Sequence, residues 1–333
     1  HRPPPALGPS RGRGRRPAPG MMSVRPASTA GRPSGPAEAN APDAATGAGL
    51  VYTLLAATGF ASVSILTSAA VATGLSLTTV LTWRYVLAAV ALTLWVGARG
   101  YRRIPPREML RFVALGGFGQ ALLVYLALAS LAYIPAATLA FLFYTYPAWV
   151  AVAQAVRGAE RIDARRALAL ACSFGGIAVM VGRPSAGGID PRGVALAIGA
   201  AIVYGAYIPM MRVLQKDHPV APTSAYAKIG SALAFLVVSV ADRSFTAQLT
   251  PSAWGIIALL TLGSTVLPGV FFMQGLVRLG PVRTAIVSSV EPFLTAVLAA
   301  VVLGQPLTWA TLAGGAAIVA AVALLQVRRE RVA

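Results

Sequence analysis

Residues 136–160 read AATLAFLFYTYPAWVAVAQAVRGAE. The segment as far as Val156 carries no charged side chain, and Pro147 lies near its middle. An α-helix rises 1.5 Å per residue, so about 20 apolar residues are needed to cross roughly 30 Å of hydrocarbon. The stretch therefore predicts a transmembrane helix that is interrupted by a proline.

The rest of the chain contains nine further apolar runs of similar length. Of the 333 residues, 56% are hydrophobic and only 11% are charged, whereas about 25% of the residues in a soluble domain are charged. We therefore expect an all-α polytopic membrane protein with ten transmembrane helices. The expected spans are 50–73, 78–97, 109–131, 136–156, 166–182, 193–214, 222–241, 252–275, 282–303 and 307–327.

The formal net charge of +18 arises from the loops and tails. If the N-terminus is inside, the inside segments hold 23 Lys and Arg residues, and the outside loops hold only Arg183, Arg192 and Arg243. By the positive-inside rule this asymmetry predicts that both termini are cytoplasmic. We expect the protein in the plasma (inner) membrane of a bacterium, and we interpret the basic excess as a topology signal, with no nucleic-acid partner.

The two ends of the chain differ from its apolar centre. Residues 1–48 are rich in Pro, Gly, Ala, Ser and Arg and lack apolar periodicity, so we expect a disordered basic tail. The doublet Met21-Met22 is the expected start of the native protein. Residues 328–333 form the expected cytoplasmic C-terminal tail.

Few side chains in this sequence could support enzyme chemistry. The chain has one cysteine, Cys172, and two histidines, His1 and His218, so we expect no disulfide framework, no metal site and no cofactor. It has no Gly-x-x-x-x-Gly-Lys-Ser/Thr loop for ATP. An intramembrane enzyme would need a nucleophile or metal constellation that the spans do not supply, so this class is not expected.

An internal repeat connects two distant parts of the chain. The Tyr-Pro pair at 146–147 is followed, thirteen residues after its proline, by Glu160. The Glu-Pro pair at 291–292 is followed at the same spacing by Gln305. This offset divides the spans into two sets of five, and because five is odd, the second set enters the membrane in the opposite orientation, as in many secondary transporters. The expected repeats are residues 49–183 and 191–327.

The motifs of the two repeats are similar to a known family. The first copy has Leu-Ala-Tyr-Ile-Pro-Ala-Ala-Thr-Leu-Ala-Phe-Leu at 131–142, Tyr-Thr-Tyr-Pro at 144–147 and Gly-Ala-Glu-Arg-Ile at 158–162. The second copy has the Glu-Pro pair and Leu-Gly-Gln-Pro-Leu-Thr at 303–308. Both resemble the EamA repeat of the drug/metabolite transporter (DMT) superfamily, over about residues 50–327. One departure is Gln305, where the family usually has Glu.

The resemblance implies a secondary transporter that works by alternating access around a site at the middle of the lipid bilayer. Its implied substrate is a small organic metabolite such as an amino acid, and export is the implied direction. A non-transporting membrane subunit and a subunit that flips a lipid carrier remain open as alternatives. The sequence leaves the oligomeric state open.

The two prolines point to the candidate substrate site. Pro147 and Pro292 fall at the middle of spans in the two repeats, and a proline there removes one helical hydrogen bond and frees a backbone acceptor. Broken helices at equivalent positions of inverted halves indicate a midplane binding site. The alternative is a kink that serves packing alone.

Aromatic and polar side chains surround these prolines. Phe143 and Tyr146 share one helical face and Tyr144 adjoins it, so they could form an aromatic wall of a cavity or pack against neighbouring helices. On the partner span, Ser288 and Glu291 share a polar face. Glu291 is expected to couple transport to protons or to bind a substrate amine, and the alternative is a protonated carboxyl that only holds the kink.

Two basic residues, Arg84 and Lys228, lie within spans at nearly equivalent places of the two repeats. A charge within the membrane usually faces protein or water and is a candidate for function. We expect the pair to attract an anionic group at the two entrances of the central cavity. The alternative is that each side chain extends to the membrane surface, since both lie near helix ends.

Overall fold

The computed structural model describes residues 44–102, 104–134, 136–160, 162–181, 190–304 and 306–326. The chain divides into two units, His1–Ala41 and Pro42–Ala333, and the described residues all belong to the second. Residues 44–48, which we expected in the N-terminal tail, are instead the start of a helix. The rest of that tail and the C-terminal tail lie outside the described residues.

In the first half, the described residues form five helices, three of which are interrupted. In chain order these are α1 (Ala44–Ala61) with α2 (Val63–Val71), α3 (Leu77–Ala98), α4 (Pro106–Ala114) with the π-helix η1 (Leu115–Gly119) and α5 (Gln120–Ser130), α6 (Ala136–Phe143) with α7 (Tyr146–Val156), and α8 (Ala164–Val181).

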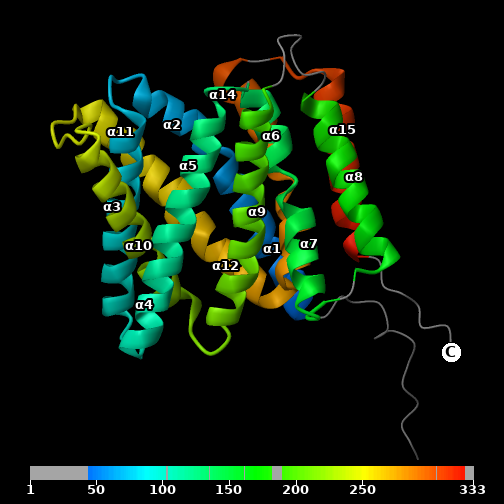
Figure 1. The fold of residues 1–333 in the computed structure, drawn as a ribbon, viewed down its shortest axis with the longest axis horizontal. Helices are drawn as coiled ribbons and strands as arrows, with labels where there is room; N and C mark the ends of the chain where they lie inside the picture. The colour runs from blue at the N-terminus through cyan, green and yellow to red at the C-terminus, as the bar shows by residue number, and fades with distance from the viewer. Residues whose placement is uncertain are drawn as a thin grey trace, which may run out of the picture. The chain divides into compact units, whose positions relative to one another are not determined.

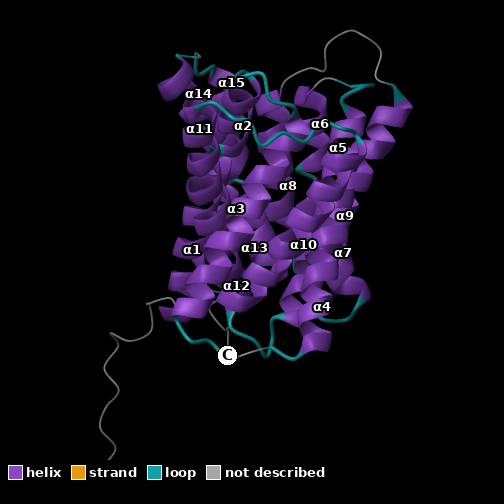
Figure 2. Ribbon diagram, turned by 90° about the vertical axis from the view of Figure 1, so that its left-hand side faces the viewer, coloured by secondary structure: helices purple, strands orange, loops and turns teal. Residues whose placement is uncertain are grey.

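The second half also contains five helices within its described residues. They are α9 (Pro191–Leu214), α10 (Val220–Ala241), α11 (Pro251–Thr261) with the π-helix η2 (Leu262–Val266) and α12 (Leu267–Leu279), α13 (Pro281–Ser288) with α14 (Glu291–Leu303), and α15 (Trp309–Gln326). In Figure 2 every regular element of the described chain is helical, and most helices run side by side in one bundle.

The ten-helix prediction is confirmed for the described part of the chain. Eight of the ten helices are long and apolar enough to cross a membrane by themselves. The other two, α8 and α15, have 18 residues each, and two arginines follow the first residue of α8. These two helices, the fifth of each half, pack against each other, as Figure 1 shows.

Two of the interruptions recur at matching places in the two halves. The third helix of each half contains a π-helical turn, η1 in one and η2 in the other. The fourth helix of each half is broken, after Phe143 and after Ser288, so that the proline lies in the first turn of the following helix. There the missing proline N–H has no intrahelical acceptor to lose, which is why proline is tolerated at that position.

The two halves pack on each other in a crosswise pattern. Helix α1 packs on α12 and α5 on α9, while α3 pairs with α10 and α8 with α15. Exchanging each helix for its counterpart in the other half reproduces the same set of pairs. This is the packing expected of two similar halves related by a two-fold axis.

Glycines allow the closest of these contacts. A Cβ atom placed on Gly230 of α10 would lie 2.0 Å from the carbonyl oxygen of Val113, and one on Gly116 would lie 2.2 Å from the carbonyl oxygen of Ala227. Gly176 of α8 and Gly314 of α15 approach each other in the same way. Small residues at such places let helix backbones come together in a membrane, where packing, and not water exclusion, drives association.

The two broken helices depart from this symmetry. Helix α7 packs against α13, and Tyr146, Val150, Ala285 and Ile286 are buried there. Their counterparts α14 and α6 have other neighbours, because α14 packs on α1 and α15, and α6 packs on α5, α8 and α9. The described bundle is therefore closed where α7 packs on α13, whereas α6 and α14 pack on other helices and not mainly on each other.

Candidate functional site

A cavity of about 520 Å³ lies inside the bundle, on the α6 and α14 side of the α7–α13 contact. Cavities of about 300–1,000 Å³ typically hold small organic ligands. Residues of both halves line it, and none of them comes from α8 or α15. Its charged lining residues are Arg84, Lys228 and Glu291.

Arg84 is held in place by the π-helix η2. Its side chain is 8% exposed; its Nε donates to the hydroxyl of Thr265 at 2.6 Å, and its Nη2 donates to the carbonyl oxygen of Ser264 at 3.4 Å. A π-helical turn is wider than an α-helical turn and often marks a functional site. Here the turn supplies two oxygen acceptors for a cation inside the bundle.

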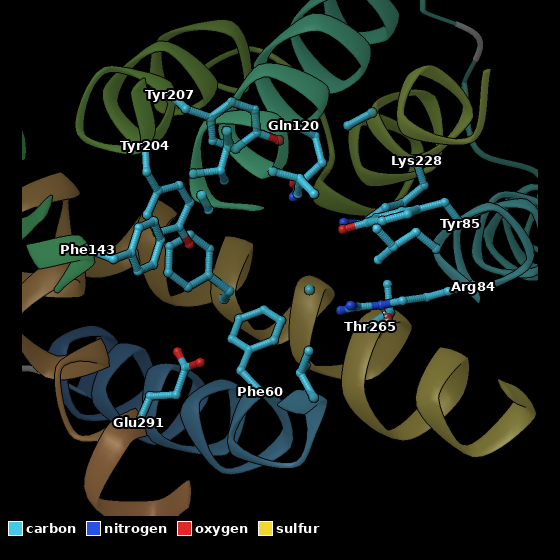
Figure 3. Close-up of a pocket in the computed structure, with 18 of the residues that line it drawn as sticks. Phe60, Arg84, Tyr85, Gln120, Phe143, Tyr204, Tyr207, Lys228, Thr265 and Glu291 are labelled. Atoms are coloured by element: carbon cyan, nitrogen blue, oxygen red, sulfur yellow. Dashed lines mark hydrogen bonds between the residues drawn. The ribbon is translucent and has the colours of Figure 1, made fainter. Parts of the chain in front are cut away.

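Lys228 lies in the same cavity, close to the ring of Tyr85. Its Nζ is 5.1 Å from the centre of that ring, and the guanidinium carbon of Arg84 is 5.3 Å from the same centre. Figure 3 shows Arg84, Tyr85 and Lys228 together on one side of the cavity. Among the described residues, the Lys228 ammonium has no hydrogen-bond acceptor and no carboxylate partner; its contact is with the aromatic ring.

The structure corrects our expectation for these two basic residues. We predicted Arg84 and Lys228 at two separate entrances, but they share one ring within one cavity. The repeat places them at similar depths, and the crosswise pairing of α3 with α10 then brings them together. The alternative prediction, that the Arg84 side chain extends to the membrane surface, is also wrong, because its guanidinium is buried against η2.

An aromatic wall forms a second side of the cavity. The rings of Phe143 and Tyr204 are stacked, with centres 5.7 Å apart, and the Tyr146 ring lies 4.7 Å from that of Tyr204. Tyr207 continues the row, 6.3 Å from Tyr204. Tyr146 is only 2% exposed, and its hydroxyl donates to the carbonyl oxygen of Ala285 at 3.4 Å. Tyr146 therefore joins the wall to the α7–α13 contact.

Glu291 lies apart from the two cations, in the first turn of α14, directly after the helix break. Figure 3 shows its carboxylate pointing into the cavity, with Phe60 between it and Arg84. The hydroxyl of Tyr144 faces this carboxylate. The cavity thus has an acidic side built from the two broken helices and a basic side built from α3 and α10.

Six of the nine residues that we selected from the sequence line this one cavity: Phe143, Tyr144, Tyr146, Glu291, Arg84 and Lys228. The other three, Ser288, Pro147 and Pro292, lie outside its lining. Ser288 is 3% exposed and is buried beside the Tyr146 hydroxyl, and the two prolines begin the helices that follow the breaks. These three shape the backbone around the site.

Several lining residues were not predicted from the sequence: Phe60, Tyr85, Gln120, Tyr204, Tyr207 and Thr265. Gln120 could have been found, because a polar amide within an apolar span carries the same signal as a charge. The aromatic residues of α9 could not, since nothing local indicates which side of that helix faces the cavity. Among the described residues, no group of His, Cys, Asp or Glu could hold a metal ion.

A bundle of membrane-crossing helices in two similar halves, with a solute-sized cavity between them, defines the class of membrane transporters. The EamA-like transporter family model matches residues 47–182 and again residues 191–327, so this chain belongs to that family, whose members are DMT-type transporters and not enzymes. No curated protein matches its sequence. Among solved structures, the crystal structure of a protein that is 18% identical superimposes with a TM-score of 0.71, covering 84% of this chain and 96% of that one. At this identity the likeness concerns the fold.

Proposed function

We propose that this protein is a secondary transporter that carries a small organic metabolite, such as an amino acid, out of a bacterial cell by alternating access. The observation that carries the proposal is the cavity of about 520 Å³, which is lined by both halves and bordered by two broken helices. Membership of the EamA-like transporter family supports the class of activity.

The unequal packing of the broken helices supports the alternating-access part. Where α7 and α13 pack together, the described bundle is sealed, and the cavity lies beyond this contact. Two similar halves can exchange conformations, so a second state would pack α6 against α14 and separate α7 from α13. If the basic loops are cytoplasmic, the described state is closed toward the cytoplasm.

Solute counterflow in proteoliposomes tests the transport activity. Liposomes containing the purified protein and an unlabelled metabolite mixture are diluted into buffer with single labelled metabolites, and a substrate should accumulate transiently. Val124 lines the cavity on α5, whereas Val237 is 67% exposed on α10. Val124→Trp should therefore abolish counterflow by filling the cavity, and Val237→Trp should leave it intact.

Absence of counterflow for every metabolite would contradict the proposal and favour a non-transporting or lipid-carrier-flipping subunit. Equal counterflow by the two tryptophan variants would show that the solute does not pass through this cavity. Export is tested separately, by comparing metabolite release from cells that express the protein with release from cells that express Val124→Trp.

A further inference from the structure

We infer that the cavity is built for an organic anion with an aromatic or otherwise apolar body, whose anionic group binds between Arg84 and Lys228. The inference rests on the proposed transport function and narrows its substrate class. It starts from the charges of the lining, which holds two basic side chains and one carboxylate.

Within the part of the chain that the structure describes, neither cation forms an ion pair with a carboxylate. Arg84 uses Nε and Nη2 on neutral oxygens of η2, and its Nη1 makes no hydrogen bond with a described residue. Lys228 has only the Tyr85 ring among the described residues. A cation in a region of low dielectric is costly unless it is paired, so two unpaired cations on one ring call for an anion from outside the protein.

The two cations approach the same aromatic ring from different helices. Both cations lie within 5.3 Å of the centre of the Tyr85 ring, one from α3 and one from α10. The free guanidinium nitrogen and the ammonium together offer charge-assisted hydrogen bonds to a carboxylate or a similar anion.

The rest of the lining fits an apolar body. Figure 3 shows Phe143, Tyr204 and Tyr207 across the cavity from the two cations, and the Tyr146 ring packs on that of Tyr204. Aromatic rings stack well on such surfaces, with centres about 4.5–7 Å apart. Glu291 carries the only carboxylate of the lining and lies apart from the cations, so it leaves their charge available to the solute.

Three probes of similar shape and different charge test the inference: 3-phenylpropionate, 3-phenylpropionamide and 3-phenylpropylamine. Their binding to the full chain in lipid nanodiscs at pH 7 is measured by calorimetry. We expect the carboxylate to bind at least about tenfold more tightly than the amide, because hydrogen bonds to charged groups are stronger than those to neutral groups. The amine should bind most weakly.

Variants locate the effect. Lys228→Gln should remove most of the preference for the carboxylate over the amide, and Lys228→Arg should keep it. Lys216→Gln changes the same residue type in an exposed loop and should behave as wild type. If the wild-type protein binds the amide or the amine as tightly as the carboxylate, or binds no carboxylate, the inference is wrong. It is also wrong if the preference survives in Lys228→Gln.

The wild-type comparison needs no variant, so a misfolded Lys228→Gln protein would not prevent the test. The inference and the proposed function also fail separately. Counterflow of a metabolite without preference for the carboxylate would contradict only the inference. Tight, Lys228-dependent binding of the carboxylate without counterflow of any solute would contradict only the transport function.

Discussion

At the scale of single residues, Tyr146 and Glu291 occupy equivalent positions, each directly before the proline of its repeat. Their environments differ. Tyr146 is enclosed in the α7–α13 contact, whereas Glu291 is partly exposed and points into the cavity. One position of the repeat thus supplies a packed phenol in one half and a carboxylate in the other.

The burial of Tyr146 changes what its removal should do. From the sequence alone, Tyr146→Ala should weaken transport and leave stability unchanged. In the structure its ring packs on Tyr204, so Tyr146→Ala should lower both transport and stability. The free energy of unfolding should fall by about 3–5 kcal/mol, as for other buried aromatic residues. Tyr146→Phe keeps the ring and should cost at most about 1.5 kcal/mol, the value of one hydrogen bond. Thermal unfolding in detergent measures this, and similar losses for both variants would contradict the packing account.

Glu291 is proposed to couple transport to protons, because a carboxyl beside a solute inside the membrane can change its charge between the two conformations. Glu291→Gln keeps the volume but cannot ionise. In proteoliposomes we expect this variant to lose the dependence of transport on an imposed pH gradient. Asp217→Asn, in an exposed loop, is the matched control. A wild-type response to the gradient in Glu291→Gln would assign the carboxyl a structural role.

At the scale of helices, the interruptions place the site. Without the break after Ser288, Glu291 would continue an unbroken helix. Without η2, the carbonyl oxygen of Ser264 would accept a regular hydrogen bond within its own helix. The sequence indicates the breaks through their prolines. It does not indicate the π-turns, because the glycines they contain are equally typical of places where membrane helices pack closely.

The close approach of α4, η1 and α10 can be tested at its glycines. Gly230→Ala would place a methyl group 2.0 Å from a backbone oxygen, so the helices must separate. This should lower the free energy of unfolding by about 1–3 kcal/mol or more. Gly97→Ala makes the same change on α3, where a Cβ meets nothing within 4 Å, and should be neutral or slightly stabilising. The two melting temperatures in detergent give the comparison, and equal values would refute the close packing.

At the scale of the whole molecule, the sequence predicts the ten helices, the two halves and the region of the cavity. The apolar runs, the repeat and the two prolines suffice for these three predictions, because each of these signals can be read directly from the order of the residues. The pairing of Arg84 with Lys228 on Tyr85 was not predictable, since it depends on the crosswise contact of α3 with α10, which no local pattern records. The aromatic residues of α9 depend on the same long-range packing.

Alternating access predicts opposite changes in reactivity at two sites. Cys172 is the only cysteine, so its replacement by Ser gives a background for single cysteines. Ile286→Cys, on the sealed α13, should react slowly with a water-soluble maleimide, and Ser64→Cys, in the cavity lining, should react quickly. Conditions that favour the second state should reverse this order. Parallel changes at both sites would indicate local loosening instead.

The orientation in the membrane remains a prediction from the charge distribution. Reporter fusions at Gly100 and Ala247 should report opposite compartments, with Gly100 cytoplasmic. The loop that contains Gly100 is rich in arginine, whereas the loop that contains Ala247 has Arg243 as its one basic residue. The same compartment for both fusions would contradict the ten-span topology. Opposite compartments with Gly100 outside would invert the predicted orientation.

The crosswise pairing of the helices also affects how the chain is assembled during synthesis. Each of α1, α3, α5 and α8 has its main partner in the second half, so the first half leaves the ribosome with its glycine-lined contact surfaces uncovered. Helix α8 in particular must remain in the membrane until α15, the last helix, has been made. Lipid covers these surfaces in the meantime, and synthesis that stops before α15 leaves α8 without its main packing partner.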